Sequence, residues 1–129
     1  MTRKPDLLSD GWCLEDGEEY HQAAPGSFQI PELSVRNALQ PGDYAKLIFA
    51  IAVADDKQPS YERMWVIVRE RVATGYLGLL DNDPDSITEN DRLWSGVELP
   101  FEPRHIIDVL RGDSASIALA SGVVTRAWR

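Results

Sequence analysis

Cysteine is nearly absent from this chain of 129 residues, which contains only Cys13. A single cysteine excludes a disulfide within the chain and is typical of a reducing compartment. The chain also lacks the apolar segment of a signal peptide, because residues 1–6 run directly into charge. The longest apolar-leaning stretches, 45–54 and 115–124, are shorter than the ~18–20 residues that span a bilayer. We therefore predict a cytoplasmic protein without a membrane partner.

Positive charge is scarce as well, because 13 lysines and arginines stand against 21 acids, for a net charge of −8. Proteins that bind nucleic acids use lysine and arginine to displace counterions from phosphates, so we predict no nucleic-acid partner. An acidic surface instead accelerates encounter with a positively charged protein. The simpler alternative is that the charge serves solubility alone.

Residues suited to catalysis are few and scattered: Cys13 and two histidines, His21 and His105. Nothing in the sequence orients His21 toward Cys13, and the acids around Cys13 disfavour its thiolate. His105 precedes an expected strand, where a capping or surface role is more typical than catalysis. Residues so dispersed do not form a zinc site. We predict no catalytic residue, no metal site and no cofactor, and therefore not an enzyme.

The length and the 43% hydrophobic content are those of one globular domain, residues 1–129. Its N-terminal arm, 1–41, is acid-rich and interrupted by prolines, so we expect an irregular path. Helical spacing of apolar residues within 32–40 predicts a short helix that ends at Pro41. Three aromatic residues of the arm are expected to pack onto the domain: Trp12, Tyr20 and Phe28.

Alternating apolar residues predict a β-rich core over about 42–109. The first expected strand is apolar on both faces, so its outer face should also be covered by the N-terminal arm. Short strands with one long loop are typical of a small SH3-like β-barrel, and the predicted fold is mainly β (α+β). In the C-terminal extension, 110–129, residues 114–122 suit either a helix or an added strand. The expected strands are 44–53, 62–71, 76–80, 97–101 and 106–109.

The long loop holds the densest group of acids in the sequence. Oxygen-bearing residues at alternate positions resemble a calcium loop, but an EF-hand needs glycine and glutamate where Ser86 and Arg92 stand. We predict a structural turn without metal there. The acids then serve either as a solvated loop or as a recognition loop for a cationic partner. The candidate partner-binding acids are Asp81, Asp83, Asp85, Glu89 and Asp91.

Four tryptophans are a high count for this length, and two of them lie in or near the core region. Trp65 and Trp94 could line a peptide groove such as small barrels carry, with nearby aromatics. Packing in the core is the alternative. Trp94 lies in a polar loop, where burial is less natural, so it is the stronger surface candidate. The nearby aromatics are Tyr61, Tyr76 and Phe101.

Five runs resemble, in their order, the bacterial domain of unknown function numbered 2314, over roughly 28–109. The resemblance implies a small bacterial domain, found alone or beside modules such as ankyrin repeats, and it assigns no catalytic residues. Similar small domains occur among immunity proteins of toxin systems, which is an analogy only. The extension after Val109 is outside the pattern. The runs are Pro-Gly-Asp-Tyr-Ala-Lys-Leu-Ile-Phe (41–49), Glu-Arg-Met-Trp-Val (62–66), Gly-Leu-Leu-Asp-Asn-Asp-Pro (78–84), Val-Glu-Leu-Pro-Phe (97–101) and His-Ile-Ile-Asp (105–108).

The function predicted from these observations is a noncatalytic interaction module that binds a basic protein, such as a toxin or effector in an immunity-like role. Its supports are the negative charge, the acidic 81–91 loop and the excess of aromatics. The alternative is a regulatory domain that holds a small ligand in an aromatic groove near Trp65 and Trp94. The sequence does not indicate an oligomeric state.

Overall fold

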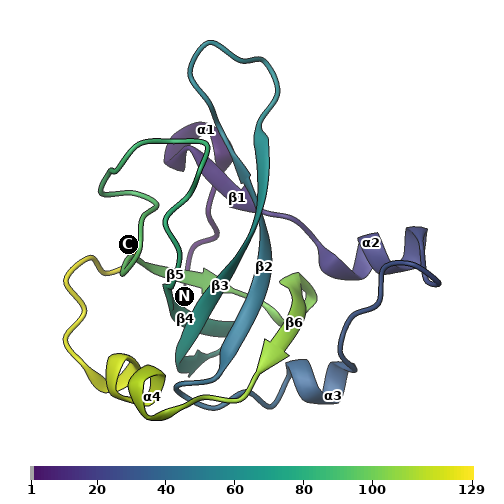
Figure 1. Ribbon diagram of the computed structural model, residues 1–129, viewed down its shortest axis with the longest axis vertical. Coiled ribbons are helices and arrows are strands. Elements are labelled where there is room, and N and C mark those ends of the chain that lie inside the picture. The colour runs from purple at the N-terminus through teal and green to yellow at the C-terminus, as the bar shows by residue number, and fades with distance from the viewer. Residues whose placement is uncertain (1) are drawn as a thin grey trace.

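A computed structural model describes residues 2–129, in which antiparallel strands form one curled, six-stranded sheet (Figure 1). The strands are β1 (Trp12–Leu14), β2 (Tyr44–Ile51), β3 (Ser60–Val72), β4 (Gly75–Leu80), β5 (Glu98–Phe101) and β6 (Ile106–Leu110). Short helical elements accompany them: α1 (Leu7–Asp10), α2 (Gly17–Ala23), α3 (Leu33–Arg36), the 3-10 turn η1 (Pro103–His105) and α4 (Ser114–Ser121). None of the helices within 2–129 is long and apolar enough to cross a membrane.

The strand order is that of a small barrel. β2 to β5 form a meander in which each strand pairs with the next. After η1 the chain returns, and β6 pairs with β2 over residues 44–47. β1 pairs with β2 farther along, over 49–51. This order is that of an SH3-like barrel, so the predicted mainly β, barrel-like fold is confirmed. The predicted strands end within about two residues of the observed ones, the usual uncertainty of such boundaries.

The inner face of the sheet forms the core. Alternate residues of β2 point inward, and Ala45, Leu47 and Phe49 are fully buried. Tyr76 and Phe101 stack there with ring centroids 5.3 Å apart. The Tyr76 hydroxyl donates a hydrogen bond of 2.8 Å to a backbone carbonyl, which satisfies the polar end of a buried ring. Tyr76 and Phe101 therefore contribute to the core rather than to a surface groove.

The outer face is covered too, as the two-sided apolar pattern predicts. Ile48 and Ile67 point outward yet are only 3% and 2% exposed. α4 packs against β3 on this side, and Gly42 permits the approach. Its φ of +97° is one that L side chains rarely adopt, and an added Cβ would lie 2.9 Å from Ile117 Cα. The C-terminal extension therefore shares the covering role that the sequence assigned to the N-terminal arm alone.

The N-terminal arm contains more regular structure than the sequence indicated, because β1 extends the sheet and α2 lies against η1. Trp12 is 1% exposed and packs 5.7 Å from Phe49, as expected of an arm aromatic. Arg36 is buried and attaches the arm to η1. Its guanidinium donates to the carbonyls of Pro31 and Pro103 and pairs with Glu18 at 2.8 Å.

The segment after β6 forms a helix, which answers the question of helix or strand at 114–122. Asp113 caps α4 by accepting a hydrogen bond of 2.8 Å from the Ser116 amide. The chain then returns to β5, where the Glu98 amide donates to the Arg126 carbonyl at 3.0 Å. Trp128 packs edge-on against Trp12 and beneath the Arg3 guanidinium. The last residues thus lie beside the first described ones (Figure 1).

Candidate functional site

The loop that joins β4 to β5 carries the predicted partner-binding acids. All five, which are Asp81, Asp83, Asp85, Glu89 and Asp91, have exposed side chains. The ion pairs found within residues 2–129 involve other acids, so none of the five is neutralised by a neighbouring base there. The loop therefore presents to solvent five carboxylates that take part in none of these ion pairs.

One end of this loop is fastened by the carboxylate of Glu62 on β3. It accepts hydrogen bonds from the backbone amides of Asp85, at 2.9 Å, and Ser86, at 3.0 Å, and another from the Ser86 hydroxyl. Burial would raise the pKa of Glu62, but these hydrogen bonds outweigh it and hold the pKa below its ordinary value. Glu62 therefore remains ionised and fixes the backbone of the loop.

Two asparagines fasten the rest of the loop. Asn82 accepts a hydrogen bond of 2.7 Å from the Trp65 amide. The Asn90 side-chain oxygen accepts from the amides of Arg92 and Leu93, at 2.8 and 2.7 Å, in a local turn. Leu93 itself is 1% exposed and anchors the loop in the core. The acids thus project from a backbone that is already ordered.

Glu62 and Asn82 had no signal of their own in the sequence, because a carboxylate in a strand and an amide in a loop are ordinary. Their roles depend on the register that brings β3 beside the end of β4. Both lie in runs that carry the family resemblance, 62–66 and 78–84. The hydrogen bond between Trp65 and Asn82 joins these two runs, whereas Glu62 binds residues just after the second run. The resemblance itself stays a prediction.

Trp65 and Trp94 are both half-buried and lie in different settings. Trp65 is edge-on to Tyr44, with ring centroids 6.4 Å apart, and the Lys46 ammonium lies 5.5 Å from its ring. The Trp94 carbonyl accepts a hydrogen bond of 3.1 Å from the Val97 amide. Among the described aromatic pairs, none joins these two rings. Their proposed sharing of a groove remains a prediction.

Asp81 lies at the start of the loop, where its surroundings are also acidic. Although its side chain is exposed, neighbouring atoms remove part of its hydration and raise its pKa, and the charge of Asp113 at the start of α4 raises it further. Asp113 itself is engaged by the Tyr44 hydroxyl at 3.1 Å and by the α4 amides. The negative potential of the loop therefore extends toward α4.

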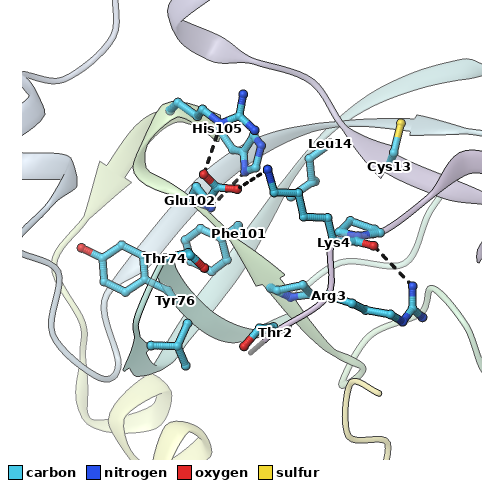
Figure 2. A pocket seen from close by; sticks show the side chains of 14 residues that line it. Thr2, Arg3, Lys4, Cys13, Leu14, Thr74, Tyr76, Phe101, Glu102 and His105 are labelled. Atoms are coloured by element: carbon cyan, nitrogen blue, oxygen red, sulfur yellow. Dashed lines mark hydrogen bonds and ion pairs between the residues drawn. The ribbon is translucent and has the colours of Figure 1, made fainter.

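A small cavity of about 110 Å³ has Cys13 and His105 in its walls, beside Lys4 and Glu102 (Figure 2). His105 Nδ1 accepts a hydrogen bond of 2.9 Å from the Glu102 amide, which confirms the capping role expected of this histidine. Burial, and next the charge of Glu15, raises the pKa of Cys13. The thiol is therefore protonated at neutral pH and poorly suited to nucleophilic attack.

His21 lies apart from that cavity, and its Nδ1 is 2.7 Å from the Phe28 carbonyl. The described residues contain no cluster of three metal-ligating side chains. Comparisons of this chain with protein-family models, with curated proteins and with solved structures found no match. Its function is therefore inferred from its own residues.

Proposed function

We propose that this protein is a noncatalytic binding module that captures a basic protein partner through the loop 81–91. The observation that carries the proposal is the set of five exposed, unpaired carboxylates on a loop whose backbone is fastened by Glu62, Asn82 and Asn90. A toxin or effector with a positive surface is the partner class we favour, and the cytoplasm is the compartment.

The physical reasoning concerns both rate and affinity. Carboxylates on one loop create a local negative potential that steers a positive partner during diffusion. A loop that is ordered before binding loses less conformational entropy when the complex forms. Each exposed charge pair contributes at most about 1 kcal/mol, so several pairs must act together for a stable complex.

The test compares two triple variants with the same net charge. The loop variant, D83N/E89Q/D91N, removes three carboxylates that accept none of the described hydrogen bonds, whereas the scattered variant, E19Q/E32Q/E70Q, removes three exposed acids elsewhere. Binding is measured by calorimetry at low salt against a panel of purified basic proteins that includes lysozyme and cytochrome c. We expect the loop variant to weaken binding about tenfold, since three pairs supply about 1.5 kcal/mol.

The scattered variant should bind within about twofold of the unmodified protein, because its charges lie off the proposed surface. Equal weakening by both variants would reduce the effect to net charge and contradict the proposal. Failure of the unmodified protein to bind any basic protein at low salt would contradict it as well. The small-ligand alternative has less support, because none of the described aromatic pairs joins Trp65 to Trp94.

A further inference from the structure

A groove of about 540 Å³ lies directly beside the acidic loop. One wall is the end of β2 and the residues after it, 51–54, and the facing wall is formed by loop residues 86–93. Residues 10–12 close one end. The groove therefore lies between the end of β2, where the long β2–β3 hairpin begins, and the loop 81–91. Both segments extend toward the upper end of the sheet in Figure 1.

The walls of this groove are mainly apolar. Ile51, Trp12 and Leu93 form its deepest part and are each 1% exposed, so they belong to the core. Ala52 is exposed on one wall, and half-buried Ile87 lies on the other. Such a surface favours an apolar side chain over water, and the volume suits side chains of a bound segment.

The rim of the groove is acidic. Asp91 lines it, Glu89 is in the same wall segment, and Asp55 and Asp56 continue the opposite wall at the hairpin tip. Arg92 is the one base among the lining residues. Its guanidinium lies 3.4 Å from the Ser9 carbonyl. The pKa of Asp10, at the same end, is lowered mainly by a hydrogen bond from Arg3 and least by the charge of Arg92. Asp10 is already paired with Arg3 at 2.7 Å, so Arg92 adds one positive charge at the end wall.

We propose that this groove docks a short basic segment of the partner, with one apolar side chain on the floor and lysine or arginine on either side. This rests on the proposed function and names the part of the partner that is bound. Charge selects this occupant: the rim repels nucleic acid and anionic lipid, and a second copy of this chain carries a net charge of −8 itself.

The probe is a synthetic peptide, Lys-Arg-Leu-Lys-Arg, with Lys-Arg-Ser-Lys-Arg as its matched polar control. Ala52→Phe fills the groove without changing any charge, and Ala73→Phe makes the same change in the exposed β3–β4 turn. Affinity is measured by fluorescence polarisation at low salt. We expect A52F to weaken binding of the leucine peptide about tenfold and A73F to leave it within about twofold. The serine peptide should bind about tenfold more weakly than the leucine peptide.

Amide NMR spectra provide the structural control, because shifts of A52F outside the groove segments 10–12, 51–54 and 86–93 must match those of the unmodified protein. If A52F does not fold, Thr88→Phe on the facing wall takes its place. Equal affinities for the leucine and serine peptides would contradict docking in the groove. An unchanged affinity of A52F for the leucine peptide would contradict it as well. If D83N/E89Q/D91N weakens binding in that same experiment, the acidic loop remains the binding surface and only the groove is wrong.

Discussion

At the scale of single residues, His105 shows how burial determines a protonation state. Its side chain is 8% exposed, and its Nδ1 is occupied as the acceptor of the Glu102 amide proton. Burial, and next the charge of Arg104, lowers the pKa of His105 to about 4. The ring is therefore neutral at pH 7 and carries its proton on Nε2.

This lowered pKa makes stability depend on pH. Unfolded chains protonate histidine near pH 6.5, whereas the folded protein does so only near pH 4. The stabilisation is therefore fully present above about pH 6.5 and is lost as the pH falls through the folded value. We expect a loss of roughly 3 kcal/mol from this residue between pH 7 and pH 4, measured by urea denaturation.

His105→Asn is the control for that experiment, because its amide oxygen can still accept the Glu102 amide proton but does not titrate. Its free energy of unfolding should fall less over the same pH range, with the other groups titrating alike in both proteins. Parallel pH profiles for the two proteins would contradict the lowered pKa of His105.

At the scale of elements, the long loop and β3 form one unit through Glu62. The sequence predicted the strands on either side of the loop, but it did not predict the hydrogen bonds that join the loop to β3. Alternation along 44–53 and 62–71 is a local signal, and it gives the inner and outer faces of β2 and β3 correctly. A hydrogen bond from residue 85 to residue 62 depends on strand register, which no local pattern contains.

β1 was missed for a related reason. Its three residues are too few to show a period, and they form a strand because the edge of β2 has unpaired backbone groups there. The candidate acids, in contrast, were found because charge density is itself local. Their exposure agrees with a surface role, whereas the hydrogen bonds that order them appear only in three dimensions.

Glu62→Gln tests the unit directly. The two carboxylate oxygens of Glu62 each accept a hydrogen bond from a loop amide, and in glutamine an NH₂ group, which cannot accept, replaces one of these oxygens. One loop amide would lose its acceptor, so about 1–3 kcal/mol of stability should be lost at pH 7. Hydrogen exchange of the Asp85 and Ser86 amides should accelerate. Since the folded pKa of Glu62 is below its ordinary value, its stabilisation is fully present above the ordinary value. The difference from the unmodified protein should disappear as the pH falls through the lowered folded value.

The exposed Glu70 on the same strand gives the matched control, because it accepts none of these loop hydrogen bonds. Glu70→Gln should leave exchange at 85 and 86 unchanged. Slow exchange of these amides in Glu62→Gln would mean that Asn82 and Leu93 hold the loop without the carboxylate.

At the scale of the whole molecule, the distribution of charge favours approach of a partner from one side. The net charge of −8 is unevenly compensated. Ion pairs neutralise acids within the arm and between the arm and η1, whereas the loop acids form none of the described ion pairs. A positive partner should therefore approach the loop side first. The amino-acid composition predicts that the partner is positively charged. The position of the loop 81–91 in the fold predicts the side of the molecule that the partner approaches.

The association rate with a basic protein that binds should consequently depend on salt. Raising the ionic strength from about 10 to about 150 mM shortens the screening length from about 30 to about 8 Å, so the rate constant should fall about tenfold or more. Stopped-flow mixing of D83N/E89Q/D91N should give a shallower dependence than E19Q/E32Q/E70Q. Identical slopes for these variants would indicate that the loop does not steer association.

The meeting of the first and last described residues has a mechanical consequence. Arg3 Nε donates a hydrogen bond of 2.6 Å to the Arg129 carbonyl, and Trp128 is held between Arg3 and Trp12. Tension applied between residues 3 and 129 would act on these contacts of Arg3 and Trp128 before it acts on any strand pair of the barrel. The final segment would then separate from β5 one contact at a time, first at Trp128 and next at Arg126.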